Sequence, residues 1–119
     1  MIAEELRTMA MNKLGASEDI KWEDHVCFSV AKKMFMVITP DHIPVSASFK
    51  VDIETFETVI SKPGFSKHKY LGRYHWVQLD NINRLSRKEW DEFINLTYSL
   101  VVEKLSSKTR KNLEGLISS

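Results

Sequence analysis

The chain has 119 residues and a formal net charge of +1, with 43% hydrophobic and 28% charged residues. This is the balance of one globular domain, expected to span residues 1–119. It contains no long apolar run, no basic and apolar secretory leader and only one cysteine, Cys27, so we expect a cytoplasmic protein without a membrane partner or internal disulfide.

The N-terminal half alternates between helix and strand signals. Apolar residues recur at helical spacing over residues 2–14, and Gly15 ends that pattern. Residues 16–19 are expected to form a turn. Residues 26–30 alternate like a half-buried strand, and the apolar run 34–39 indicates a central strand. The short link between these two strands predicts a hairpin, although it lacks the Gly or Asn that such turns favour.

A third antiparallel strand is expected over residues 45–51, where apolar and polar residues again alternate. Asp52 can cap a helix that follows and that Pro63-Gly64 ends. Residues 64–75 have the composition of a basic loop, and residues 76–79 that of another short strand.

The last long helix has the clearest start signal. Ser86 and Glu89 form a capping box, and Leu85 and Trp90 are spaced for a hydrophobic staple. Residues 106–119 either form a short terminal helix or fray. The predicted order is helix, three strands, helix, one or two strands, helix, which gives an α+β fold with an antiparallel sheet and helices packed on one face.

Positive charge is concentrated in one part of the sequence. Residues 62–88 carry seven Lys or Arg and a single acid, Asp80, for a net charge of +6. Cations next to aromatic residues suit a polyanion, because Lys and Arg neutralise phosphates and rings stack on exposed bases. The candidate nucleic-acid-binding residues are Lys67, Lys69, Tyr70, Arg73, Tyr74, His75, Arg84 and Arg87, with Lys32 and Lys33 at the hairpin tip. The alternative is a solvated loop whose aromatic side chains pack on the core.

Other chemistry has weaker sequence support. His25 and Cys27 share a strand face and could supply half of a metal site, but no further ligands stand at a familiar spacing. A buried Cys27 acting as a small hydrophobe is the simpler interpretation. The sequence has neither a nucleophile elbow nor a glycine-rich phosphate loop. We therefore expect no cofactor, no metal and no catalytic activity.

Four stretches, in order, resemble the MmcQ/YjbR family. They are Trp22-Glu23-Asp24 running into Val26–Val30, then Lys33-Met34-Phe35, then Phe49–Asp52 with Pro63-Gly64-Phe65, Tyr70-Leu71 and Trp76-Val77, and finally Thr97–Val102 with Lys104-Leu105 and Lys108. The sequence departs from the family pattern at Ala31-Lys32, at Lys50–Ile53 and at Lys67–Tyr70. The second departure removes a cysteine that the family usually has.

The resemblance implies a fold similar to that of type III secretion chaperones. It also implies a candidate DNA-binding role, since some family members are described as having a "double wing" of hairpins. We therefore expect a non-catalytic module that contacts DNA or another nucleic acid through the basic loop and the hairpin. The alternative is a protein-interaction or chaperone-like module whose partner is another protein or a second copy of the chain.

Overall fold

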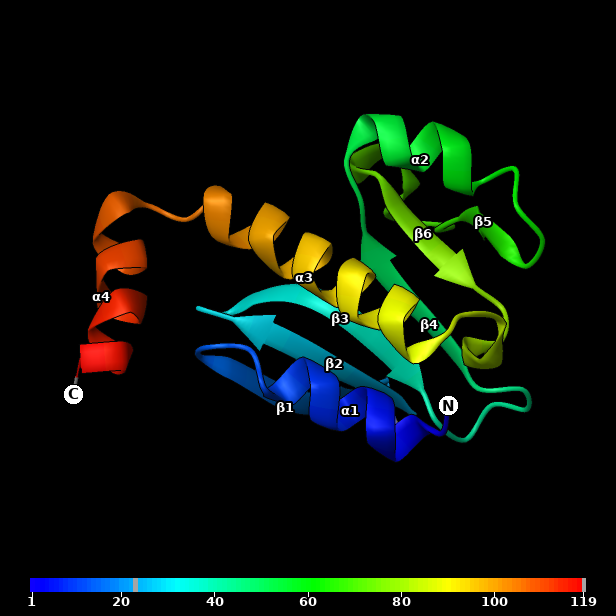
Figure 1. The fold of residues 1–119 in the computed structure, drawn as a ribbon, viewed down its shortest axis with the longest axis horizontal. Coiled ribbons are helices and arrows are strands. Elements are labelled where there is room, and N and C mark those ends of the chain that lie inside the picture. The colour runs from blue at the N-terminus through cyan, green and yellow to red at the C-terminus, as the bar shows by residue number, and fades with distance from the viewer. Residues whose placement is uncertain (23, 119) are drawn as a thin grey trace.

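The computed structural model describes residues 1–22 and 24–118 (Figure 1). In chain order the elements are α1 (Ala3–Met11), β1 (Ala16–Lys21), β2 (His25–Val30), β3 (Lys33–Thr39), β4 (Ser46–Lys50), α2 (Ile53–Val59), β5 (Phe65–Lys67), the 3₁₀ turn η1 (Gly72–Tyr74), β6 (Trp76–Leu79), the 3₁₀ turn η2 (Ile82–Arg84), α3 (Arg87–Glu103) and α4 (Ser107–Ser118).

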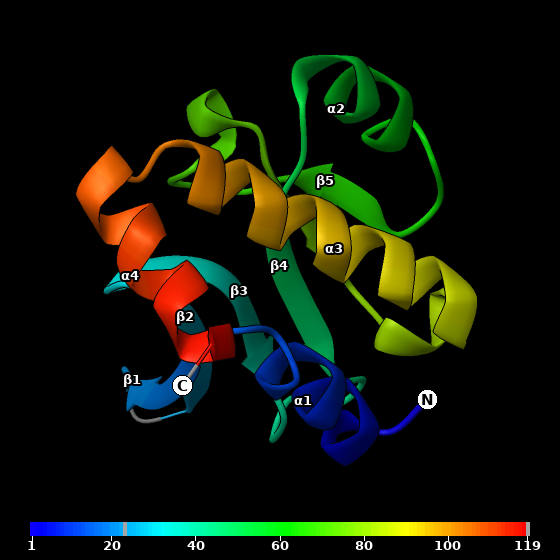
Figure 2. The same ribbon diagram turned by 60° about the vertical axis from the view of Figure 1, so that its left-hand side comes forward.

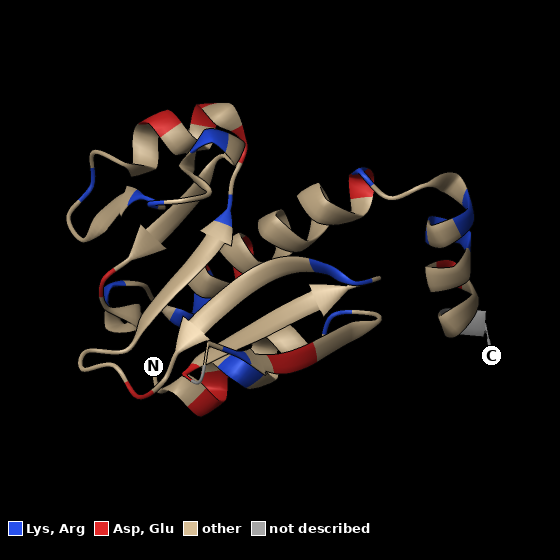
Figure 3. Cartoon of the chain, turned by 180° about the vertical axis from the view of Figure 1, so that it is seen from behind, with Lys and Arg blue, Asp and Glu red and all other residues tan. Residues whose placement is uncertain are grey.

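The strands form one antiparallel sheet in the order β1-β2-β3-β4-β6-β5. Helices α1 and α3 cover one face of this sheet, and α4 follows α3 at the end of the molecule (Figures 1 and 2). The opposite face, which we call the outer face, carries no helix and is seen from the front in Figure 3. The predicted α+β fold is therefore confirmed.

Alternation along the strands divides the apolar side chains between two clusters. The larger cluster lies between the sheet and the helices and includes Phe28, Phe49 and Trp90, all fully buried. The indole Nε1–H of Trp90 donates a hydrogen bond of 2.9 Å to the carbonyl of Ile82, which satisfies its one polar group. The smaller cluster lies on the outer face and consists of Cys27, Val37 and Trp76, against which Met34 and Leu71 pack.

Residues 16–19 form part of strand β1, so the expected turn is wrong. β1 pairs with β2 from Ala16 opposite Val30 to Lys21 opposite His25. It is an edge strand and largely exposed, which lets it carry Ser, Glu and Asp that a central strand would exclude. The predicted first helix is also shorter than expected, because α1 ends at Met11. The chain consequently has four strands before α2 instead of three.

Local signals were more reliable at the turns and caps. The predicted hairpin between β2 and β3 is present, and both Ala31 (φ 49°) and Lys32 (φ 67°) adopt left-handed backbone conformations without glycine. The capping box is confirmed, since Ser86 and Glu89 exchange hydrogen bonds of 3.0 and 3.1 Å. Asp52 stands at the N-cap of α2, but its side chain makes no capping bond and its Oδ1 is buried without a partner. The expected loop 64–75 contains β5 and η1.

Candidate nucleic-acid interface

A groove of about 770 Å³ crosses the outer face of the sheet. Its floor comes from β3, β4 and β6, one end from the β1–β2 hairpin, and the other from the segment between β5 and η1. The lining residues, which define the outer-face groove from here on, are Trp22, His25, Met34, Val37, Thr39, Ser46, Ala47, Ser48, His68, Lys69, Tyr70, Leu71 and Gln78. Among the described residues, none of these lining side chains is a carboxylate, and the adjacent acid, Asp24, is engaged with the lining residue His25.

Two aromatic rings stand at opposite ends of this groove. Trp22 lies in the β1–β2 hairpin and is 67% exposed, while Tyr70 lies in the segment after β5 and is 74% exposed. The ammonium of Lys69 lies 5.5 Å from the Tyr70 ring centroid. Exposed rings with a cation alongside can stack on a planar ligand and attract a negative one.

His68 organises the segment that carries Tyr70. Its Nδ1 accepts hydrogen bonds from the backbone N–H groups of Tyr70 and Leu71, each at 3.1 Å. An Nδ1 that accepts two hydrogen bonds carries no proton, so the ring is neutral with its proton on Nε2. Burial, and secondarily the nearby charge of His25, lowers the pKa of His68 and favours this neutral form.

His25 belongs to the opposite end of the groove. Its Nδ1 lies 2.6 Å from a carboxylate oxygen of Asp24, and its ring stands edge-on to Trp22 at 5.4 Å between centroids. The bond to Asp24 orients the His25 ring, and the edge-on contact with His25 positions the Trp22 ring beside the groove.

Four of the sequence-predicted residues lie together in the β5–β6 connection: Lys69, Tyr70, Arg73 and Tyr74. Lys67 ends β5, and its ammonium lies 5.9 Å from the ring centroid of Phe56 in α2. Gly72 brings the two ends of this segment close, because its backbone N–H donates to the carbonyl of His68 at 2.9 Å and it packs beside the Lys67 side chain. Arg73 lies over the Tyr74 ring at 4.9 Å, so each exposed tyrosine has its own cation.

The remaining predicted residues are placed elsewhere. His75 turns toward α2, where its ring lies 5.4 Å from that of Phe56. Lys32 and Lys33 stand at the β2–β3 hairpin tip, away from the β5–β6 connection (Figure 3). Lys33 pairs with Val30, whose side chain belongs to the cluster between the sheet and the helices.

Arg84 and Arg87 each face an acid. The Arg84 guanidinium holds the Asp80 carboxylate through bonds of 2.6 and 3.2 Å, and Arg87 lies 3.7 Å from a carboxylate oxygen of Glu5. Their charge is therefore partly neutralised within the protein.

Cys27 offers little chemistry. It is fully buried, and burial raises the pKa of its thiol, which disfavours the reactive thiolate. Across residues 1–22 and 24–118, no three His, Cys, Asp or Glu side chains are grouped as metal ligands would be. No helix in that same part of the chain has the length and apolar character to cross a membrane.

Of the groove lining, the sequence-predicted binding residues include only Lys69 and Tyr70. The lining residues that were not predicted include Trp22, His25, His68 and Gln78. The available signal was Trp22 itself, a large aromatic residue placed between Lys21 and the acidic pair Glu23-Asp24. An exposed large aromatic side chain is a stronger indication of a binding surface than an exposed small hydrophobic side chain.

The YjbR family model matches residues 11–100 of this chain. No curated protein matches it at a significant level. Among solved structures, the Deinococcus radiodurans protein DR2400, which carries a DUF419 domain, is similar with a TM-score of 0.85 and 21% identity, covering 95% of this chain and 88% of that one. A Pseudomonas syringae protein is similar with a TM-score of 0.70 and 20% identity, covering 84% of this chain and 98% of that one. At these identities the structural matches establish the fold.

Proposed function

This chain belongs to the YjbR family, and because that membership names no activity, we propose one from the groove: the protein binds single-stranded nucleic acid across the outer face of its sheet. The observation that carries the proposal is the pair of exposed rings, Trp22 and Tyr70, in one groove whose described lining also includes Lys69 and contains no carboxylate. Rings at a groove can stack only on bases that are free of a duplex, which favours a single strand.

The mechanism divides affinity between stacking and phosphate contact. Trp22 and Tyr70 provide base platforms at the two ends of the groove, and Tyr74 provides a third exposed ring beside Arg73. Lys69 and Arg73 neutralise phosphates from the β5–β6 connection, and Lys67 does so from the end of β5. Lys32 at the β2–β3 hairpin tip adds a further cation outside the groove lining. Because the contacts are few, affinity is expected to be modest, and because the cations contact phosphates, affinity is expected to fall as salt rises.

The direct test is fluorescence anisotropy with labelled twelve-nucleotide single strands at 50 and 200 mM salt. Replacing Trp22 or Tyr70 by Ala is expected to weaken binding about 5- to 100-fold, the range for loss of one stacked base. Lys69→Gln is expected to weaken binding and to reduce its salt dependence.

Arg84→Gln supplies the matched control, because it removes one positive charge that Asp80 already neutralises and that lies outside the groove lining. It should leave affinity within about twofold of the original protein. Equal losses for Lys69→Gln and Arg84→Gln would mean that only net charge matters, and would reject the groove. No binding at 50 mM salt would reject the function.

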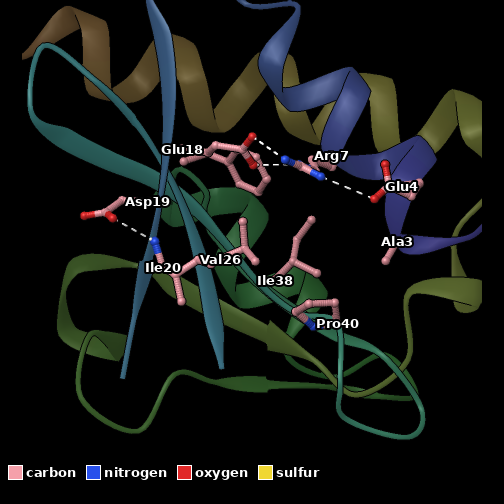
Figure 4. Close-up of a pocket in the computed structure, with 10 residues that line it drawn as sticks. Ala3, Glu4, Arg7, Glu18, Asp19, Ile20, Val26, Ile38 and Pro40 are labelled. Atoms are coloured by element: carbon pink, nitrogen blue, oxygen red, sulfur yellow. Dashed lines mark hydrogen bonds and ion pairs between the residues drawn. The ribbon is translucent and has the colours of Figure 1, made fainter. Parts of the chain in front are cut away.

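A protein-interaction role is the second candidate, and strand β1 is the observation that favours it. This edge strand exposes Ile20 at 67%, next to a pocket of about 470 Å³ whose wall includes Val26, Ile38 and Pro40 (Figure 4). The backbone N–H of Ile20 donates a hydrogen bond of 2.9 Å to the Asp19 carboxylate, on the side of β1 away from β2.

A second copy of the chain fits this edge. If two β1 strands pair antiparallel with Ile20 opposite Ile20, the symmetry places Asp19 opposite the partner's Lys21, and the reverse, on one sheet face. Light scattering at about 100 µM protein tests it. A dimer that Ile20→Lys converts to a monomer supports this candidate, and a monomeric original protein refutes it.

A further inference from the structure

His68 presents a fixed donor at the outer-face groove. Both hydrogen bonds that its Nδ1 accepts come from its own segment, the N–H groups of Tyr70 and Leu71 at 3.1 Å. Since the proton must then be on Nε2, the opposite edge of the ring is a hydrogen-bond donor and cannot act as an acceptor. His68 is one of the lining residues, so this donor is available to a ligand in the groove.

The other polar groups of the lining include acceptors as well as donors. The Nδ1 of His25 faces the Asp24 carboxylate at 2.6 Å, so in the neutral ring its Nε2 is an acceptor. The hydroxyl of Thr39 is engaged with Ser46, through that residue's carbonyl and hydroxyl. Ser48 and Gln78, which stand directly opposite each other on β4 and β6, can donate or accept. Lys69 only donates. The fixed donors among the described lining residues are therefore His68 and Lys69, and no carboxylate lies among them.

Bases differ in what they present to such a site. Thymine and uracil carry two carbonyl acceptors and one N–H donor, whereas cytosine and adenine each carry an exocyclic amine that requires an acceptor. A buried or half-buried amine that finds no acceptor loses affinity, because it has given up its hydrogen bonds to water.

We propose that the outer-face groove selects thymine or uracil, and that His68 is the specificity residue, donating from Nε2–H to a base carbonyl. The proposal rests on the proposed single-strand binding and names its preferred bases. Gln78 is placed to complete the recognition, because its amide can pair with both the remaining carbonyl and the N–H of such a base.

The test measures anisotropy at pH 7.5 for labelled twelve-nucleotide strands of thymidylate, uridylate, cytidylate and adenylate. The original protein is expected to bind the thymidylate and uridylate strands about 5- to 10-fold more tightly than the other two, the value of one hydrogen bond to a neutral partner. His68→Asn is the informative variant. The Asn Oδ1 occupies the place of the His Nδ1 and can accept the same two backbone bonds, but the Nε2–H is lost.

Each outcome has a distinct meaning. If His68→Asn binds all four strands alike, near the original affinity for cytidylate, while its melting temperature stays within a few degrees, the inference is supported. If the original protein binds all four alike, prefers cytidylate or adenylate, or keeps its preference in His68→Asn, the inference is overturned while single-strand binding stands. If it binds none of them, the proposed function itself fails.

Discussion

His68 connects protonation with the shape of the outer face. Because its Nδ1 accepts two backbone hydrogen bonds, adding a proton there must break both of them. Leu71, which one of these bonds positions, packs on the cluster of Cys27, Val37 and Trp76. Protonation of the His68 imidazole is therefore expected to weaken the packing of Leu71 on that cluster and to release the backbone of Tyr70.

The pH dependence of stability follows from the direction of the shift. Burial lowers the pKa of His68 in the folded protein below the usual 6.5, so the unfolded chain binds this proton more readily. The free energy of unfolding should fall as the pH drops below about 6.5, and His68→Asn should show a smaller fall. Urea denaturation from pH 5 to 8 measures both. Parallel curves for the two proteins would contradict this role, whereas His68→Ala should lose about 1–2 kcal/mol even at pH 8 because it leaves two N–H groups without their acceptor.

At the scale of elements, helix α3 ends next to the end of strand β4. Thr97 of α3 accepts a hydrogen bond of 2.9 Å from the backbone N–H of Lys50, and Lys104 follows on the same helix face two turns later. Burial, together with the ammonium of Lys104, lowers the pKa of Lys50 to about 8. Two like charges are thus held together where the helix meets the sheet.

Removing one of these charges should be measurable. Since the folded-state pKa of Lys50 lies below 10.5, stability is lost as the pH falls from about 10.5 through about 8. Lys104→Gln should raise the pKa of Lys50 and flatten that slope, although burial keeps the pKa below its usual value. Titration of the lysine side chains by NMR gives the pKa directly. Lys108→Gln, the same change in α4, should leave Lys50 unaffected.

Element prediction succeeded where short-range chemistry decides the structure. The capping box at Ser86 and Glu89 and the apolar run of β3 are local signals, and both were predicted from sequence. Strand β1 was missed because its polar residues are stabilised by pairing with β2, a contact between segments that periodicity does not report. The three residues of β5 are too few to produce a pattern.

The groove shows the same limit at the scale of the whole molecule. Tyr70 and Lys69 were predicted from the basic block. Trp22 lines the same groove because the sheet order places the β1–β2 hairpin and the β5–β6 connection over the same face. Conversely, Arg84 and Arg87 belong to the same basic block in sequence, and the fold places Asp80 and Glu5 beside them. Charge along a sequence says little about which charges a ligand meets, because an acid within the block (Asp80) or from a distant helix (Glu5) can neutralise a cation in the folded protein.

Thr97 links the layers of the whole molecule. Its buried hydroxyl donates to the carbonyl of Phe35 in β3 at 2.7 Å and accepts from the N–H of Lys50 in β4. Thr97→Val keeps the shape but leaves both backbone groups unsatisfied, so it should lower the free energy of unfolding by about 2–4 kcal/mol. Thr97→Ser retains the hydroxyl and should cost less than half as much. Chemical denaturation measures both variants, and equal losses would show that the methyl group matters more than the hydrogen bonds.

The three tryptophans give this protein a built-in set of optical reporters. Trp90 is wholly enclosed between helix and sheet, Trp76 is 6% exposed on the other side of the sheet, and Trp22 is 67% exposed. A water-soluble quencher such as iodide should therefore extinguish the emission of Trp22 and leave the other two nearly intact. An oligonucleotide lying against the indole of Trp22 would shield it from iodide, whereas unfolding would expose all three rings together. Ligand occupancy and loss of structure can thus be told apart in one cuvette, without attaching a dye.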